Sequence, residues 1–284
     1  MMQTSWTNTR TQDQPWLLPW PLANIVAGEP MDAYRLDSLT RRFTPITLQE
    51  MDAVMLLDRT DTKFVLSTAQ LLQALAAVQH DYRMLAVQGI RLNRYRTLYF
   101  DTADFALYHL HVNDRAERYK VRSREYTDSG LSFLEVKHKT RKDRTVKDRV
   151  PTARQVTQLS AAAAGWLEQI FPYATDALEP KLWNTFTRVT LVSRERCERV
   201  TLDVDLAFHT ETQRRSLPGV AVAEVKTDSA GQPSPFMEQM HAQHIRPMGF
   251  SKYCIGVSLL YQQVKKNTLK PTLLQVEKII EGMD

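Results

Sequence analysis

The sequence predicts an α+β protein built on an antiparallel sheet, with helices between and after its strands. Several segments alternate apolar residues with charged ones, which is the pattern of a strand with one buried face and one polar face. Segments with apolar residues at helical spacing separate these strands, for example after Ser67, where Leu71, Leu72 and Leu75 share one helix face. Strands interleaved with short helices in this way are typical of the α+β class.

The elements follow one another along the chain in a definite order. We expect strands at 58–67 and 91–102, two basic strands within 117–149 that turn at Gly130, a hairpin over 182–210 that turns at Arg194–Arg196, and a strand at 219–228. We expect helices after Ser67 and at 103–114, 152–171, 234–244, 251–264 and 272–282.

Three regions are expected. Residues 1–40 are interpreted as an N-terminal tail with little regular structure, because prolines stand at 15, 19 and 21 and no periodicity is sustained. Residues 41–265 form the sheet domain, and residues 266–284 form a C-terminal helical extension.

Composition places the chain among ordinary globular proteins. Its 284 residues are 43% hydrophobic and 24% charged, with a net charge of +5. Cys197 and Cys254 are too far apart for metal-ligand spacing and too few for a disulfide framework, so we expect a reduced, cytoplasmic setting. No apolar run approaches the roughly 18 residues of a membrane span, and the N-terminus is not a secretory signal.

Positive charge is concentrated between residues 115 and 149 and follows the alternation of the strands. Arg118, Lys120, Arg122 and Arg124 fall on one face of the first basic strand. Carboxylates interrupt the cations at matching positions of other strands, and these mixed sets are Glu135 with Lys137 and Lys139, Glu224 with Lys226, and Asp61 with Lys63.

Two interpretations of this polar face stay open. On the pattern alone, a sheet whose polar face meets solvent is the more common case. If the strands instead close into a barrel, the cations point at one another, and each like-charge pair costs about 3–4 kcal/mol at an effective dielectric near 20. A cationic interior of this kind predicts a bound polyanion, with the carboxylates holding a divalent metal.

Eight short motifs in order give the sequence a resemblance to a known family. They lie between residues 41 and 261 and are "DTKFVLS", "LYFDTADFALYH", "RYKVRSREY", "FLEVKHK", "VKDR", "RVTLDVDL", "VAEVKTD" and "GFSKY". In this order the sequence resembles the VTC domain, which is the polyphosphate polymerase branch of the triphosphate tunnel metalloenzyme (CYTH-like) superfamily. The resemblance implies an antiparallel β-barrel tunnel with helices packed outside. It also implies ATP and polyphosphate as substrates, Mn²⁺ or Mg²⁺ as cofactor, and a possible membrane-protein partner that receives the chain.

The resemblance and the alternating pattern together name the candidate site. The residues expected to act on the transferred phosphate are Lys63, Lys120, Arg122, Lys137, Arg188 and Arg199. Further phosphate-binding residues are Arg59, Arg118, Arg124, Lys139, Lys147, Lys226 and Lys252. Glu224 and Glu135 are the expected metal ligands, with Asp203 or Asp205 as possible helpers. Simple ion pairing stays open for Glu135, Asp203 and Asp205, and a surface position stays open for Arg188 and Arg199.

Three functions from different classes follow. The favoured one is a phosphotransferase of the polyphosphate polymerase type, which moves the γ-phosphate of ATP onto a polyphosphate chain. The second is a tunnel triphosphatase, although the ExExK motif of that branch is replaced here by Arg59, Asp61 and Lys63, which removes one carboxylate. The third is a non-catalytic polyphosphate-binding module. Nucleic acid is disfavoured, because the interleaved carboxylates would repel its backbone and no aromatic stacking run is seen among the basic strands.

Overall fold

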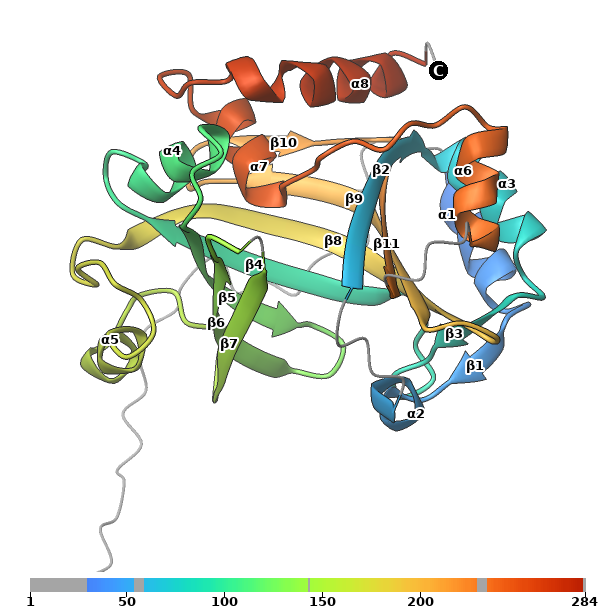
Figure 1. Ribbon diagram of the computed structural model, residues 1–284, viewed down its shortest axis with the longest axis horizontal. Helices are drawn as coiled ribbons and strands as arrows, with labels where there is room; N and C mark the ends of the chain where they lie inside the picture. Colours follow the sequence, from blue (N-terminus) through green and yellow to red (C-terminus); the bar gives the residue numbers. More distant parts are fainter. Residues whose placement is uncertain (1–29, 54–58, 143, 229–233, 283–284) are drawn as a thin grey trace, which may run out of the picture.

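A curved antiparallel sheet forms the centre of the computed structural model, which describes residues 30–53, 59–142, 144–228 and 234–282 (Figure 1). Each of the eight strands along its main path pairs with its neighbours in an antiparallel register, whereas one pair of short strands, 44–46 with 83–85, is parallel. The order across the sheet is β2 (Arg59–Ser67), β11 (Val220–Asp228), β9 (Glu198–His209), β8 (Glu179–Ser193), β4 (Asn93–Asp101), β5 (Arg118–Tyr126), β6 (Leu131–Lys139) and β7 (Thr145–Thr152). Three short strands extend it, namely β1 (Thr44–Ile46), β3 (Tyr82–Leu85) and β10 (Arg214–Ser216).

The two edges of this sheet are β2 and β7, which do not pair with each other in the described part of the chain. The predicted antiparallel α+β sheet is therefore confirmed, whereas the prediction of a closed barrel is wrong for these strands. The sequence of β7 explains why it remains an edge. Pro151 has no N–H to donate to a further strand, and Lys147 and Arg149 are exposed, both of which are common on edge strands.

Helices cover the apolar, outward faces of the strands. Phe64, Leu202 and Ala223 contribute to a core that α1 (Pro30–Thr40), α3 (Thr68–Ala77) and α6 (Pro235–Ala242) help to enclose. On the other half of the sheet, Val121 and Leu134 pack with side chains from α4 (Ala106–Val112) and α5 (Ala161–Leu167). The polar faces of these strands therefore point to the inside of the curve, as alternation requires.

One helix lies on the inner side of the sheet. Apolar residues of α7 (Lys252–Leu260), including Tyr253 and Val257, pack against the inward side chains Phe186, Leu206 and Val222. The C-terminal helix α8 (Lys270–Ile280) adds Val276 and Ile279 to the same cluster. We call the side of the sheet inside the curve the concave face. One part of it is apolar and covered by α7, and the charged part lies next to that.

Some element boundaries differ from the expected ones. Of the predicted tail, residues 1–29 lie outside the described residues, and residues Pro30–Thr40 form helix α1. The helix expected over 152–171 is limited to Ala161–Leu167, where Ser160 caps it. Helix α2 (Leu48–Ala53) and the 3₁₀ turn Asn267–Leu269 complete the helical set of the described residues. None of the described helices is both long enough and apolar enough to span a membrane.

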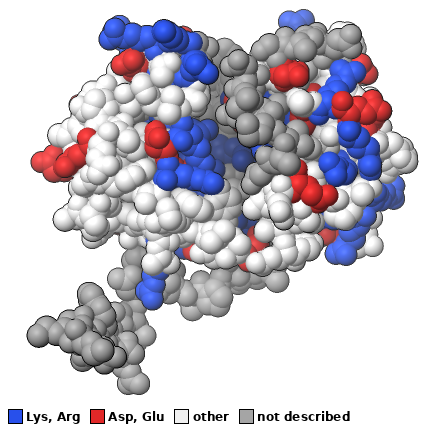
Figure 2. Space-filling view, turned by 60° about the horizontal axis from the view of Figure 1, so that its bottom comes forward, with Lys and Arg blue, Asp and Glu red and all other residues white. Residues whose placement is uncertain are grey.

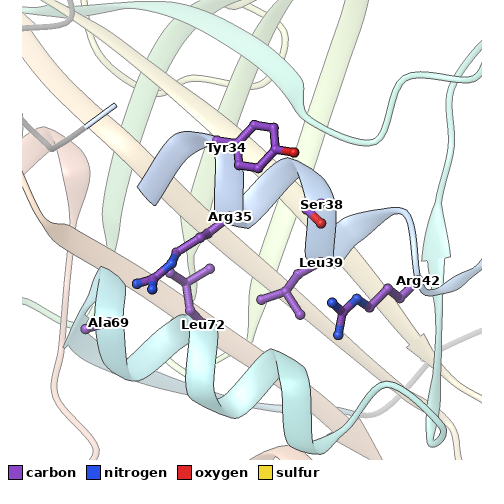
Figure 3. Close-up of a pocket in the computed structure, with 7 residues that line it drawn as sticks. All are labelled: Tyr34, Arg35, Ser38, Leu39, Arg42, Ala69 and Leu72. Atoms are coloured by element: carbon purple, nitrogen blue, oxygen red, sulfur yellow. The ribbon is translucent and has the colours of Figure 1, made fainter. Parts of the chain in front are cut away.

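A groove on the outer surface separates α1 from α3, away from the concave face (Figure 3). Its lining is mixed, with two arginines beside apolar and small side chains: Tyr34, Arg35, Ser38, Leu39, Arg42, Ala69 and Leu72.

The contact of α7 with the sheet generates a stability prediction at Gly256. A Cβ atom at this position would lie 2.5 Å from Cδ1 of Phe208 and 2.6 Å from Cδ2 of Leu182. We expect Gly256→Ala to lower the free energy of unfolding by about 1–3 kcal/mol, as overpacking of a core does. Gly165→Ala in α5 is the control, because no atom lies within 4 Å of its added Cβ. Urea denaturation of both variants measures the effect, and equal unfolding midpoints would contradict the packing described for α7.

Candidate functional site

The register of four strands brings the predicted charges together on the concave face. On β5 and β6, Arg122 lies opposite Glu135 and Lys120 lies opposite Lys137. On β2 and β11, Lys63 lies opposite Glu224 and Lys226 opposite Asp61. Directly opposed residues of an antiparallel pair point to the same side of the sheet. Each pair of strands therefore presents a row of mixed charge to the inside of the curve.

Neighbouring strands and α7 add charges to the same face. Lys147 on β7 lies opposite Lys137, and Arg188 on β8 lies opposite Asp203 on β9. Lys252 is the first residue of α7 and also contacts Asp203. Figure 2 shows this side of the molecule hollowed, with Lys and Arg side chains gathered along the hollow.

Glu135 is held by two cations. Its side chain is 0% exposed, and Oε2 accepts from Nε of Arg122 at 2.7 Å while Oε1 lies 2.6 Å from Nζ of Lys147. Burial alone would raise the pKa of Glu135, but the charges of Arg122, Arg124 and Lys147 hold the pKa below its usual value. The carboxylate therefore stays ionised and fixes the position of both cations.

Asp203 on β9 is likewise a buried carboxylate that is held by two cations. Arg188 binds it in the bidentate manner, with Nε 2.6 Å from Oδ1 and Nη2 2.7 Å from Oδ2, and Lys252 contacts the same carboxylate. Burial would raise the pKa of Asp203, and the charges of Arg188 and Lys252 lower it instead. Arg188 also lies over the rings of Tyr95 and Phe186, at 5.2 Å and 5.3 Å from the ring centroids.

Glu224 is more accessible than these two carboxylates, with 22% of its side chain exposed. It contacts Lys226, and its Oε1 lies 4.0 Å from Nζ of Lys63. Burial would raise the pKa of Glu224, but Lys63, Lys226 and Lys137 keep it below the usual value. Because Lys137 belongs to β6, its influence on Glu224 shows that the two walls of the curved sheet face each other across the hollow.

Among the residues that the structure describes, three cations of the concave face form no close ion pair with a carboxylate, although the charge of Glu135 acts on Arg124 and that of Glu224 acts on Lys137: Lys120, Arg124 and Lys137. Burial lowers the pKa of Lys120, and the charges of Lys63, Arg122 and Arg118 lower it further. The pKa of Lys137 lies well below its ordinary value because of burial and the charges of Arg122, Arg124 and Lys120. Lys147 is affected too, since partial burial of its side chain, which is 34% exposed, lowers its pKa to about 8 despite the contact with Glu135. The concave face therefore carries more positive charge than its carboxylates balance.

Four further cations that the sequence predicted to bind phosphate lie on β2, β5, β6 and β9. Arg118 forms an ion pair with Asp114 at 2.8 Å, and Lys139 lies opposite it in the register. Arg199 lies opposite Lys226 on the concave face. Arg59 begins β2, but its side chain lies outside the described parts of the structure.

Asp205, which the sequence named with Asp203 as a possible helper of the metal, does not share the face of Asp203 although strict alternation along the strand would require it. Its backbone has a φ of 54°, and the pairing of β8 with β9 shifts register between Thr185 and Thr187. Such a bulge breaks the alternation of faces, and Asp205 is exposed while Asp203 is buried.

The concave face also includes residues that the sequence did not single out. Thr97, on the same face of β4, accepts a hydrogen bond from Nε of Arg124 at 3.2 Å. Tyr95 and Phe186 lie under the guanidinium groups of Arg124 and Arg188. The alternation of Tyr95, Thr97 and Tyr99 in the strand 91–102 was the available signal, because it gives these three residues a common face.

One carboxylate of this face is a candidate for holding a divalent metal. No cluster of three or more His, Cys, Asp or Glu side chains that could hold a metal occurs among the described residues. Glu135 is already engaged through both oxygens, whereas Glu224 remains partly exposed toward the hollow. Mg²⁺ is commonly bound through one or two carboxylates together with substrate phosphates. Glu224 is therefore the carboxylate whose surroundings fit an ion shared with a phosphate ligand.

The contacts of Glu135 generate a second prediction. Glu135→Gln leaves Arg122 and Lys147 without their negative partner, so we expect a loss of about 3–5 kcal/mol in unfolding free energy. Added tripolyphosphate should recover part of this loss, because it supplies negative charge at the same place. Glu125→Gln is the control on β5, since its ion pair with Arg96 at 2.9 Å is more exposed and contributes about 1 kcal/mol or less. Urea unfolding with and without tripolyphosphate checks both. Equal losses in the two variants would show that Glu135 does not hold the site together.

Comparisons with known structures give low similarity. A candidate adenylate cyclase from Bacillus halodurans is 12% identical, with a TM-score of 0.46 over 72% of this chain and 98% of that one. A Hippeastrum protein, named as a candidate adenylyl cyclase with a dominant triphosphatase activity, is 14% identical, with a TM-score of 0.43 over 71% of this chain and 96% of that one.

Comparisons of sequence are more decisive. No curated protein matches the chain. The family model of the VTC domain, in contrast, matches residues 58–261, which begin just before β2 and end just after α7. This range contains every strand and helix that contributes a charge to the concave face. The chain belongs to the VTC domain family.

Proposed function

We propose that this protein is a phosphotransferase of the polyphosphate polymerase type, which moves the γ-phosphate of ATP onto a polyphosphate chain in the concave site. The observation that carries the proposal is the pair Lys120 and Lys137. They oppose each other in register and form no close ion pair with a carboxylate among the described residues. Burial and neighbouring cations lower the pKa of both, even though the charge of Glu224 acts on Lys137 in the opposite direction. Two such lysines are stabilised when an anion with several charges lies between them.

Each cation of the concave face has a proposed role. Lys120, Arg122, Arg124 and Lys137 hold phosphate oxygens on one wall, and Lys63, Lys226 and Arg199 do so on the facing wall. Arg188 and Lys252 bind phosphate beside Asp203, while Lys139, Arg118 and Arg59 extend the basic path. We propose that Glu135 and Asp203 act as positioning residues, because each orients two cations that point into the site.

The proposed reaction needs positioning and charge neutralisation more than acid–base groups. A terminal oxygen of the polyphosphate chain forms a bond to the γ-phosphorus of ATP. The bond from that phosphorus to the bridging β–γ oxygen breaks, and ADP leaves with the electron pair. The attacking oxygen is already anionic, so no general base is required. Lys120, Arg122 and Lys137 are the groups we propose to stabilise the charge on the transferred phosphate.

We propose that Glu224 would hold Mn²⁺ or Mg²⁺ when phosphate is bound. A divalent ion supplies neutralisation of phosphate charge when bound. Glu224 suits this role because it is partly exposed and its pKa is held low, so it is ionised at neutral pH. Glu135, which the sequence suggested as a second ligand, keeps its place with Arg122 and Lys147 in this proposal.

The packing of α7 on the concave face also agrees with a second function, the hydrolysis of triphosphate. Helix α7 packs its apolar residues into part of the concave face, which shortens the charged section of the site. A short charged site also suits the hydrolysis of triphosphate, with water in place of the polyphosphate chain. A third role, in which the site binds polyphosphate without turnover, requires only the cations.

One incubation separates these three functions. We expect protein supplied with ATP and Mn²⁺ to make long chains that a polyphosphatase degrades, and we expect Lys137→Met to reduce the rate on the order of 10²-fold. Lys142→Met is the control, because Lys142 is an exposed cation on the turn after the same strand. Gel electrophoresis of the product measures chain length. Orthophosphate as the sole product would replace the proposal with a triphosphatase, and no product with retained binding would replace it with a binding module.

The lowered pKa of Lys147 predicts a pH dependence. Lys147 has a pKa of about 8 in the free protein and must be protonated to attract phosphate, so tripolyphosphate affinity should fall as the pH rises from 7 to 9. Binding raises the pKa of Lys147, so proton uptake should accompany binding near pH 8. Lys147→Arg should flatten the profile, since arginine stays protonated over this range. Isothermal titration in buffers of different ionisation enthalpy measures both quantities, and an unchanged slope in the arginine variant would remove Lys147 from the phosphate site.

A further inference from the structure

Four aromatic side chains from four adjacent strands form a row on the concave face. We call Phe186 on β8, Tyr95 on β4, Tyr126 on β5 and Phe133 on β6 the aromatic row. The rings of Tyr95 and Phe186 are stacked, with centroids 5.0 Å apart. Those of Tyr95 and Tyr126 are 4.9 Å apart and tilted by 55°, and those of Tyr126 and Phe133 are 5.8 Å apart and nearly perpendicular, at 83°. Arg149 of β7 ends the row, with Cζ 4.8 Å from the ring of Phe133.

The aromatic row borders the phosphate-binding residues. Tyr126 lies two residues after Arg124 on β5, and Phe133 lies opposite Arg124 and two residues before Glu135 on β6. Residues two apart on a strand share a face. The aromatic row and the cations therefore belong to one continuous surface.

Burial distinguishes the two ends of the row. Phe186 is 3% exposed and belongs to the apolar cluster that α7 completes. Tyr126 and Phe133 are only half-buried, and neither is a member of the hydrophobic clusters formed by the described residues. Packing of the core thus accounts for Phe186 but not for the partly exposed rings of Tyr126 and Phe133.

The spacing along β5 suits a ligand with a flat ring at one end and phosphates at the other. At about 3.4 Å per residue, Tyr126 lies about 7 Å from Arg124 and about 14 Å from Arg122 along the strand. A nucleoside triphosphate has a ribose between its base and its phosphates, which matches this order of ring first and cations after. Inorganic triphosphate has nothing to place on the rings.

We propose that Tyr126 and Phe133, supported by Tyr95, are the platform for the base of the nucleoside triphosphate, which stacks on the face of one ring and contacts the edge of the other. This inference rests on the proposed function and deepens it, because it makes the aromatic row the part of the site that distinguishes a nucleotide from inorganic triphosphate. Stacking tolerates different bases, since every base has a π face. The row therefore selects for the presence of a base, with purines held more strongly because they cover more of the rings.

Binding measurements with two ligands test this inference. We expect Tyr126→Ala and Phe133→Ala to weaken ATP binding about tenfold or more, while the affinity for tripolyphosphate stays unchanged. Tyr126→Phe keeps a ring and should keep ATP affinity. Tyr34→Ala is the control for losing an aromatic side chain elsewhere, because Tyr34 is 76% exposed on α1. Isothermal titration of the native protein and of each of the four variants with ATP and with tripolyphosphate measures these affinities.

A spectroscopic readout reports stacking itself. The fluorescence of 2-aminopurine riboside triphosphate should be quenched when it binds the native protein and should recover in the complex with Tyr126→Ala. Unchanged ATP affinity and unchanged quenching in both alanine variants would overturn the platform while leaving phosphate binding intact. A parallel loss of tripolyphosphate affinity would make the row a structural support and overturn it as well. If the native protein binds neither ligand, the proposed function itself fails.

Discussion

Mutual repulsion among cations is the constraint on which this structure depends. A curved sheet turns Lys63, Lys120 and Lys137 from separate strands toward one hollow, where burial and like charge lower the pKa of Lys120 and Lys137. Repulsion of this kind opposes folding unless something offsets it. Glu135, Asp203 and Glu224 offset part of it, each by contacting two cations. An anion bound in the hollow, as proposed above, would neutralise more of it and would link the stability of the protein to its occupancy.

The carboxylates of this face therefore differ in burial and in the role that we propose for them. Glu135 and Asp203 are buried within pairs of cations and hold those side chains in place. Glu224 has the same chemistry but a more open position, which leaves it able to take part in metal binding. Membership of the VTC domain family agrees with the proposed phosphate binding. The difference between the buried carboxylates and Glu224 gives that proposal a physical basis in this chain.

Alternation in the sequence predicted which residues share a face, and registers such as Arg122 opposite Glu135 agree with it. It could not predict which partner each charge chooses, because partners depend on the register between strands that are distant in sequence. Asp205 shows a second limit, since one bulge reverses the parity of a strand without any sign in the pattern. The aromatic row shows a third, because Tyr95, Tyr126, Phe133 and Phe186 come from separate segments and only the fold lines them up. The closed barrel was predicted wrongly, because the pattern of charges along the strands does not indicate whether the two edge strands pair with each other.

The unpaired edges β2 and β7 have a mechanical consequence. Among the described strands no backbone hydrogen bonds join these edges. Within that part of the chain, the strands that carry Lys63 and Glu224 connect to the strand that carries Lys137 through β9, β8, β4 and β5. A phosphate chain gripped by both walls would act as a cross-brace over the open side. The substrate would then complete the cylinder that the backbone leaves unfinished, and the width of the channel would adjust to what it holds.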